Sequence, residues 1–405
     1  MTTHDDDQSH PLISRRTFLA GAVAAGAVGF AGCEKIVPGS DAGVAAEIRK
    51  ITPPRLAGAN LGKHILCYRP MRKGAPKMSA AVSDGRLVAH NYGHGGSGWT
   101  LGPGTVQHVV GLAEAEGLGT TYPKDEPITV LGAGVMGLFT AYDLLTRGYS
   151  RVTVTAASFE DLTSHNAGGL LAPVSMDNAP EMQALIDKVG VDAYRFYAQV
   201  ARGEHPHFAQ GAKIVPSYFE TREESGLEPY VGVAMAPAKE VTLDFGNGTT
   251  RAMVAYDDGI FIDTATMMHA LTEYLKSRTT FEQRKVDSLG ELESRVVFDC
   301  SGLGAGKLNA DSEMVPVQGH LIMLKDQVPE DLQYMILVYF NKDHTESGQT
   351  VKRSLYVFPK HLPDTGASDV GVVGGTFIEG GTPDTPNTVE FDIMMAGARR
   401  FYGIV

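Results

Sequence analysis

Residues 127–155 read PITVLGAGVMGLFTAYDLLTRGYSRVTVT, and this stretch decides the fold. Residues 127–131 form a short apolar run, which predicts a buried parallel strand. The pattern Gly-x-Gly-x-x-Gly follows at residues 132–137, and apolar residues at helical spacing come after its last glycine. Gly148 ends this helix, and residues 151–155 supply a second strand. A strand, a glycine turn, a helix and a strand in this order predict a dinucleotide-binding domain of the α/β class.

The three glycines of the turn have separate tasks in such a domain. Gly132 permits the tight turn, Gly134 lets the backbone touch a pyrophosphate, and Gly137 lets the helix pack closely on the strand. The first N–H groups of the helix and the positive end of its dipole then face the phosphates. The alternative is a glycine-rich turn that holds no ligand. The candidate cofactor-binding residues of this turn are Gly132, Ala133, Gly134, Val135, Met136 and Gly137.

One expected element is missing after the second strand. An acidic residue usually grips the adenosine ribose about 20 residues beyond the glycines. Residues 155–158 read TAAS here, so Ala157 stands where the acid is expected. Glu160 or Asp161 could reach the ribose instead. The departure predicts weaker or differently anchored adenosine binding.

Composition limits the class of protein. The chain has 405 residues, 43% hydrophobic and 20% charged, which predicts a globular protein with a sizeable core. A formal net charge of -12 argues against a nucleic acid partner, whose phosphates need clustered Lys and Arg. Cys33, Cys67 and Cys300 have no metal-ligand spacing with histidine, and we expect no metal. Free buried thiols are favoured for Cys67 and Cys300, and a disulfide between them stays open.

The N-terminus is expected to be an export signal. Residues 14–19 read SRRTFL, and a short apolar stretch of small residues follows. This order is typical of a twin-arginine signal peptide, so we expect residues 1–33 to direct export through the Tat translocase to the periplasm or cell envelope. Cys33 ends a sequence that resembles a lipoprotein cleavage box, but Phe30 departs from that box, so a lipid anchor at Cys33 stays open. Residues 34–60 are expected to be a linker.

The rest of the chain resembles the D-amino-acid oxidase family in eight places, three of which are residues 281–287, 316–320 and 374–377. Residues 90–100, HNYGHGGSGWT, are closely similar to the family's flavin-cradling loop, and residues 68–72, YRPMR, to its R-P-x-R element. Residues 162–173, LTSHNAGGLLAP, resemble the loop that runs along the flavin. Residues 296–305, VVFDCSGLGA, and 354–359, SLYVFP, resemble a strand and turn at the flavin and the strand of an active-site tyrosine.

The resemblance implies FAD as cofactor and gives roles to single residues. Arg69 would pair with the substrate carboxylate, Tyr356 would add a second hydrogen bond, and the carbonyl of Gly96 would accept from the substrate amine. The alternatives are an arginine in a surface salt bridge and a tyrosine of the core. The further residues implied at the cofactor are Gly95, Ser97, Gly98, Trp99, Thr100, Thr163, Ser164, Gly168, Gly169, Leu170, Cys300, Ser301 and Gly302.

The expected activity is oxidative deamination of a D-amino acid or related amine, with hydride transfer to the flavin and O2 as acceptor. The alternatives are a flavin dehydrogenase with another acceptor and a flavin-less envelope binding protein. Lys352 stands where the family has a second tyrosine, which hints at an acidic substrate side chain or only at a solvated lysine. His90 and His94 are interpreted as loop residues, because the glycines around them preclude a helix that would align them on a metal. We expect substrate specificity to reside in residues 177–249 and 333–352.

The order of the motifs predicts a circular permutation. In the family the flavin-cradling loop and the R-P-x-R element lie at the C-terminus, whereas here they precede the glycine turn. We therefore expect residues 61–116 to be the permuted C-terminal segment, with a helix over 105–116, and 117–126 to be a joining loop. Residues 127–405 would hold the interleaved FAD-binding and substrate subdomains, a Rossmann-like α/β domain interwoven with a mixed sheet. A truncated chain with a duplicated motif is the alternative, and it would leave one sheet incomplete.

Overall fold

The predicted strand, turn, helix and strand are present at the glycine-rich stretch. Strand β5 spans Ile128–Leu131, helix α2 spans Val135–Thr146, and strand β6 spans Val152–Ala156. β5 pairs in parallel with β6, and all four residues of β5 are buried. The helix begins directly after Gly134, so the glycine turn connects the two elements without a longer loop.

The computed structural model describes residues 46–404 except 347–348, 362–369 and 383–385. Some predictions concern residues outside this range and stay predictions. They are the signal peptide, the possible lipid anchor at Cys33 and residues 34–45 of the linker. Among the described residues, no helix is both long and apolar enough to cross a bilayer.

A six-stranded sheet carries the dinucleotide-binding pattern. Its strands lie in the order β12, β6, β5, β13, β4, β3, and all neighbours are parallel except the edge pair β3 and β4. The further strands span Lys77–Ser83 (β3), Arg86–Tyr92 (β4), Thr280–Gln283 (β12) and Val296–Asp299 (β13). A parallel sheet of buried strands needs helices on its faces. The helices of this part span Gly98–Ala115 (α1), Gln183–Ala201 (α4), Thr264–Lys276 (α6) and Gly304–Leu308 (α7).

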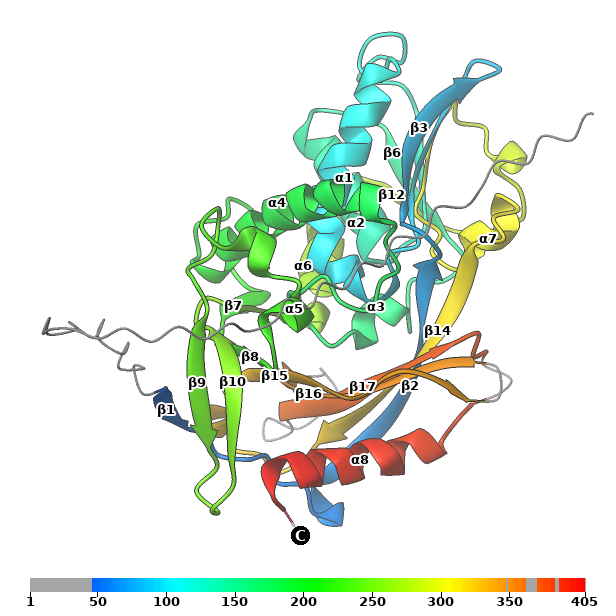
Figure 1. Ribbon diagram of the computed structural model, residues 1–405. Helices are drawn as coiled ribbons and strands as arrows, with labels where there is room; N and C mark the ends of the chain where they lie inside the picture. Colours follow the sequence, from blue (N-terminus) through cyan, green and yellow to red (C-terminus); the bar gives the residue numbers. More distant parts are fainter. Residues whose placement is uncertain (1–45, 347–348, 362–369, 383–385, 405) are drawn as a thin grey trace, which may run out of the picture. The chain divides into compact units, whose positions relative to one another are not determined.

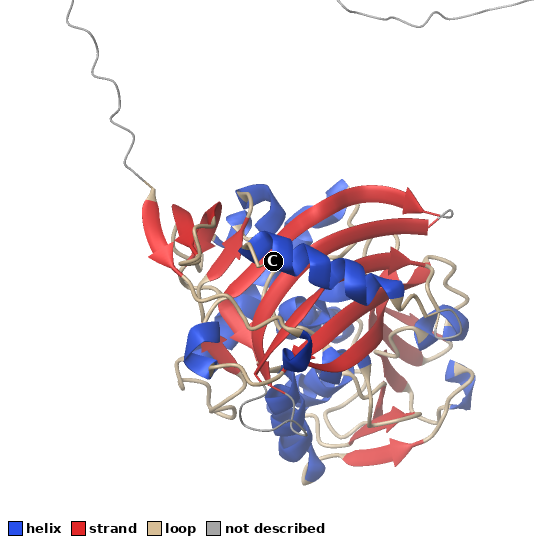
Figure 2. Cartoon of the chain, turned by 90° about the horizontal axis from the view of Figure 1, so that it is seen from below, coloured by secondary structure: helices blue, strands red, loops and turns tan. Residues whose placement is uncertain are grey.

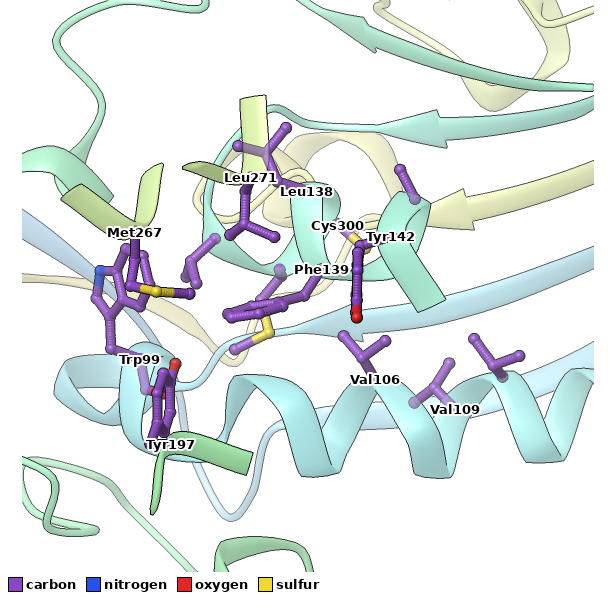
Figure 3. Close-up of a cluster of buried hydrophobic side chains, with 14 of the residues drawn as sticks. Trp99, Val106, Val109, Leu138, Phe139, Tyr142, Tyr197, Met267, Leu271 and Cys300 are labelled. Carbon is purple, nitrogen blue, oxygen red and sulfur yellow. The ribbon is translucent and has the colours of Figure 1, made fainter. Parts of the chain in front are cut away.

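Apolar packing holds α1 against α2. Figure 3 shows Trp99, Val106 and Val109 of α1 on the side of Phe139 and Tyr142 of α2. The rings of Trp99 and Phe139 meet edge to face with centroids 6.1 Å apart. This contact fixes the start of α1 beside the helix that follows the glycine turn.

A nine-stranded mixed sheet forms the second layer, with α8 (Val389–Tyr402) along one face and the six-stranded sheet with its helices on the other side (Figures 1 and 2). Its strand order is β1, β9, β10, β8, β15, β16, β17, β14, β2. These strands span Glu47–Lys50 (β1), Lys239–Asp244 (β9), Thr250–Tyr256 (β10), Ser217–Phe219 (β8), Met335–Glu346 (β15), Gln349–His361 (β16), Val370–Glu379 (β17), Met314–Leu324 (β14) and Leu61–Arg72 (β2). Short elements complete the described chain: α3 (Thr163–Asn166), α5 (Arg222–Ser225) and the strand pair β7 (Ala212–Ile214) and β11 (Ile260–Ile262).

The segment ahead of the glycine turn is built into both sheets. β2 pairs antiparallel with β14, and β4 pairs in parallel with β13. The mixed α/β fold with interleaved sheets agrees with the predicted fold class. The circular permutation itself stays a prediction.

Three local expectations differ from the structure. Residues 47–50, expected in the linker, form β1 because their backbone pairs in parallel with β9. His90 is not a loop residue, since it lies in β4 opposite Asp299 of β13. The helix predicted from residue 105 begins at Gly98. Pro103 lacks the N–H that would bond the carbonyl of Trp99, and the hydroxyl of Tyr197 donates to that oxygen instead at 2.8 Å.

Candidate active site

A cavity of ≈ 360 Å³ lies where the carboxyl ends of the parallel strands meet the nine-stranded sheet. Asn91 and Tyr92 end β4, Gly134 follows β5, and Cys300 follows β13, and all four line the cavity. The crevice at the carboxyl ends of the strands is where open α/β sheets bind their ligands. The predicted site residues that line it are Arg69, Gly95, Gly96, Gly98, Trp99, Gly134, Val135, Met136, Thr163, Ser164, Gly168, Gly169, Leu170, Cys300, Gly302 and Tyr356. The predicted site residues that lie outside its wall are Ser97, Thr100, Gly132, Ala133, Gly137 and Ser301.

The glycine turn needs its glycines for close backbone packing. Gly132 has a φ of +112°, and a Cβ there would lie 2.4 Å from the carbonyl oxygen of Cys300. A Cβ at Gly137 would lie 1.8 Å from the carbonyl oxygen of Gly132. No side chain fits at either position without moving α2 off the turn. Ser164 completes the arrangement, since its hydroxyl accepts a hydrogen bond from the backbone N–H of Val135 at 3.0 Å.

The loop over residues 167–170 lies against the second sheet. A Cβ at Gly168 would lie 2.6 Å from the ring of Phe358, and Gly169 has a φ of +104°. The ammonium of Lys360 donates to the carbonyl oxygen of Ala167 at 2.6 Å and to Thr264 Oγ1 at 2.8 Å. These contacts hold the loop at the cavity wall.

The stretch over residues 95–100 is fixed by its neighbour, residues 170–175. The backbone N–H of Gly96 donates to the carbonyl oxygen of Ser175 at 2.9 Å. Ser97 Oγ donates to Val174 O at 2.6 Å, and Thr100 Oγ1 donates to Ala172 O at 3.0 Å. The side chains of Ser97 and Thr100 are therefore buried against residues 170–175. The glycines Gly95, Gly96 and Gly98 line the cavity with their backbone.

Arg69 extends from β2 into the cavity, which Glu224 also lines. It is half-buried, and its Nη1 donates to the carbonyl oxygen of Thr376 at 2.8 Å. Within the described part of the chain, no Asp or Glu lies in ion-pair distance of its guanidinium. Gly319 makes room for it, since a Cβ there would lie 2.6 Å from Nη2. A half-buried cation of this kind attracts an anionic group from outside the chain.

Tyr356 lies beside Arg69 and stays neutral. Burial raises the pKa of Tyr356 to about 12, against the nearby positive charge of Arg69, which lowers it. Its ring stacks on Phe358 at a centroid distance of 4.7 Å. Its hydroxyl is therefore a hydrogen-bond donor and acceptor next to the guanidinium.

Several cavity residues were not among the predicted site residues. Glu224 of α5, Tyr339 of β15 and Lys352 of β16 come from the two segments in which we expected specificity. Burial, with Glu224 nearby, raises the pKa of Tyr339 to about 12, while Arg69 lowers it. Asn91 and His94 also line the cavity, although the sequence interpretation gave them no role. The motif around them was recognised, but only burial shows which of its side chains face inward.

A carboxylate of a neighbouring strand lies beside β6, near the place where the sequence lacks the expected ribose acid. Glu282 of β12 stands opposite Thr155 in the sheet, and Thr155 Oγ1 donates to Glu282 Oε2 at 2.9 Å. Arg284 Nε lies 3.0 Å from the other oxygen of Glu282. The neighbouring strand thus places an acid close to the position held by Ala157.

Neither histidines nor cysteines form a metal site in the described residues, where no group of three or more His, Cys, Asp or Glu could hold an ion. His90 Nδ1 lies 3.1 Å from Asp299 Oδ2. Cys67 and Cys300 are free thiols, which agrees with the favoured prediction, and burial raises the pKa of Cys300 to about 12.

The buried lysine predicts a pH dependence of stability. Burial lowers the pKa of Lys360 to about 8, whereas an unfolded lysine titrates near 10.4. Between these values the unfolded chain binds more protons, so the free energy of unfolding should rise with pH in this window. A Lys360→Met variant should lack this rise, a difference of about 3 kcal/mol between pH 7 and pH 11. Urea unfolding of both proteins across this range measures it. Tyrosines and cysteines titrate in both proteins and therefore affect both curves equally. If the free energy of unfolding changed with pH in the same way in both proteins, the prediction would be contradicted.

The fold and site can be compared with known proteins. Residues 127–404 match the family described as DAO, FAD dependent oxidoreductase. The chain is 30% identical over 209 residues to a D-amino-acid oxidase of Streptomyces coelicolor, covering 50% of this chain and 60% of that protein. It is 25% identical over 274 residues to a D-amino-acid oxidase of Schizosaccharomyces pombe, covering 64% and 72%. The crystal structure of glycine oxidase from Geobacillus kaustophilus covers 68% of this chain at 17% identity, with 77% of that chain covered and a TM-score of 0.48.

The match to the first two curated relatives spans about 60% of their length. The family match takes in the glycine turn and most of both sheets, more than half of the chain. FAD is the cofactor of this family, and the close backbone packing at Gly132 and Gly137 is what a pyrophosphate at the start of α2 requires. The chain belongs to the DAO family of FAD dependent oxidoreductases.

Proposed function

We propose that this protein is an FAD-dependent oxidase of a D-amino acid or a related amine, with O2 as electron acceptor. The observation that carries the proposal is Arg69, a half-buried cation in the cavity wall with no acidic partner among the described residues. Two relatives are named D-amino-acid oxidase, which supports the same substrate class. FAD, when bound, supplies the redox chemistry by accepting hydride from the substrate α-carbon.

The protein's own task is to bind and orient the substrate. Arg69 would hold the carboxylate in a charge-assisted fork, and the neutral hydroxyl of Tyr356 would add a hydrogen bond to it. The carbonyl of Gly96, a residue that lies beside the Arg69 side chain, would accept from the substrate amine. Two anchors fix a small molecule in one orientation, and holding the reacting atoms in place is itself a contribution to the rate.

A panel of D- and L-amino acids and amines tests the proposal. Purified protein loaded with FAD is mixed anaerobically with each compound, and bleaching of the flavin absorbance is followed. We expect bleaching by D-amino acids or glycine-like amines, with recovery of the absorbance when O2 is admitted.

The other outcomes separate the alternatives. Bleaching without recovery in O2 would indicate a dehydrogenase that uses another acceptor. Protein that takes up no FAD would instead favour the flavin-less binding protein and remove the proposal.

A further inference from the structure

Ser175 has an unusual backbone conformation in the wall of the cavity. Its φ is +59°, in the left-handed region that residues other than glycine rarely adopt. Elsewhere in the described part of the chain, the non-glycine residues with a positive φ are Asp84, Asp161, Ala310 and Asp326, and none of these four lines the cavity. Strained backbone that persists at a ligand site is often part of the mechanism, so this position needs an explanation.

Neighbouring segments fix the conformation of Ser175. The backbone N–H of Gly96 donates to the carbonyl oxygen of Ser175 at 2.9 Å. The same carbonyl oxygen leaves no room for a Cβ at Gly95, so the two backbones are in close contact. Two residues further along, Asp177 Oδ2 accepts a hydrogen bond from the backbone N–H of Gly74 at 3.1 Å. The surrounding structure therefore holds Ser175 in a conformation that its own backbone does not favour.

This conformation places the Ser175 side chain beside Arg69. Measured from the position that a Cβ of Gly96 would take, Ser175 Oγ and Arg69 Cδ each lie at 3.4 Å. Both side chains belong to residues that line the cavity. The hydroxyls of Ser97 and Thr100 donate to carbonyl oxygens, whereas the Ser175 hydroxyl forms no hydrogen bond with any described residue. A hydroxyl is thus available for a ligand next to the arginine side chain.

A carboxylate has room for one more donor besides Arg69 and Tyr356. Its two oxygens accept about four hydrogen bonds. A guanidinium fork supplies two donors, and the hydroxyl of Tyr356 supplies a third. A serine hydroxyl rotates freely to donate, and it brings neither charge nor bulk. Ser175 therefore suits the remaining place on a carboxylate held by Arg69.

We propose that Ser175 is a substrate-binding residue whose hydroxyl donates a hydrogen bond to the carboxylate that Arg69 holds. The left-handed backbone is the conformation that aims this hydroxyl into the cavity. The inference rests on the proposed function, because it takes the substrate to be an amino acid. It adds a side chain from the segment before α4 to a carboxylate site otherwise made by the nine-stranded sheet.

Ser175→Ala tests the hydroxyl, because alanine keeps the Cβ and removes only the donor. The KM for an amino acid should rise about tenfold with little change in kcat, since a hydrogen bond to a charged group is lost. The KM or inhibition constant of the amine that lacks the carboxylate should stay at the wild-type value. Steady-state kinetics of the FAD-loaded protein measures both. An unchanged KM for the acid, or an equal rise for acid and amine, would overturn the inference.

Ser175→Gly separates the hydroxyl from the backbone. Glycine adopts the left-handed conformation without strain, so the thermal midpoint of this apoprotein should lie above that of Ser175→Ala. Its KM for the amino acid should nevertheless rise as much as in Ser175→Ala, because the hydroxyl is missing in both. A Ser175→Gly protein with the wild-type KM would contradict the role of the hydroxyl.

Ala310→Gly is the matched control for the backbone. Ala310 has a φ of +49° in an exposed turn after α7, outside the cavity wall. The change should raise the thermal midpoint and leave KM unchanged. The two levels of the proposal can be told apart. Wild-type protein whose flavin no amino acid reduces would overturn the proposed function together with the inference. If Arg69→Leu raised KM and Ser175→Ala did not, the inference alone would be overturned.

Discussion

Replacing Arg69 with Leu is expected to raise the KM for an amino-acid substrate at least tenfold and to leave the Kd for FAD unchanged. A hydrogen bond between charged groups contributes about 1.5–3 kcal/mol, and each 1.4 kcal/mol is a factor of ten. Arg69 forms no ion pair among the described residues and donates instead to the carbonyl oxygen of Thr376, so its loss removes an attraction for the ligand without breaking an ion pair. Steady-state kinetics on a matched pair, an amino acid and the amine that lacks its carboxylate, measures the effect. The increase should appear for the acid only.

Arg72 provides the control on the same strand. It is also half-buried in β2, but its Nε pairs with Asp311 Oδ2 at 2.9 Å. Arg72→Leu should therefore lower the stability of the protein and leave KM unchanged. Arg69→Lys should fall between wild type and Arg69→Leu, because an ammonium keeps the charge and loses the planar fork. An unchanged KM in Arg69→Leu would remove this residue from the substrate site.

Local pattern predicted the dinucleotide-binding half of the fold well. β5 and β6 lie within one residue of their predicted bounds, and α2 ends within one residue of its predicted end but starts earlier. The prediction works here because the apolar residues that set the pattern are the ones that the fold buries. The start of α1 was missed because the local sequence there does not favour a helix. Its first turns contain Gly98, Gly102 and Pro103, which have poor helix propensity. Burial and the hydroxyl of Tyr197 stabilise this end, and neither is visible in the local sequence.

The site residues also fall into those that the sequence could predict and those that it could not. Arg69 and Tyr356 lie in motifs, and the fold brings them together from β2 and β16 as the resemblance implied. Glu224 and Tyr339 lie in segments without a motif, so only the tertiary structure shows that they reach the cavity. Glu282 lies beside β6 but comes from the neighbouring strand β12, more than a hundred residues along the chain, so the local sequence around Ala157 gives no sign of it.

Gly137→Val is expected to have the largest effect on cofactor binding, because it acts on the packing that forms the phosphate site. A Cβ at this position would lie 1.8 Å from the carbonyl oxygen of Gly132, and neither backbone can yield without moving α2. Overpacking of this kind costs about 1–3 kcal/mol or more. It also moves the N–H groups at the start of α2 away from the place where they would face the pyrophosphate. We expect a lower free energy of unfolding for the apoprotein and loss of FAD binding at concentrations that saturate the wild type.

Gly111→Ala separates this effect from a general intolerance of helix glycines to substitution. Gly111 lies within α1, and a Cβ there would meet no atom within 4 Å. The change should stabilise the protein by up to about 1 kcal/mol through helix propensity and leave the Kd for FAD unchanged. Urea unfolding and FAD titration of both variants test the pair. If Gly137→Val bound FAD with the wild-type Kd, the close approach of α2 to Gly132 would not be what the cofactor needs. The glycine pattern would then explain only the fold, and the affinity for FAD would have to come from the cavity side chains.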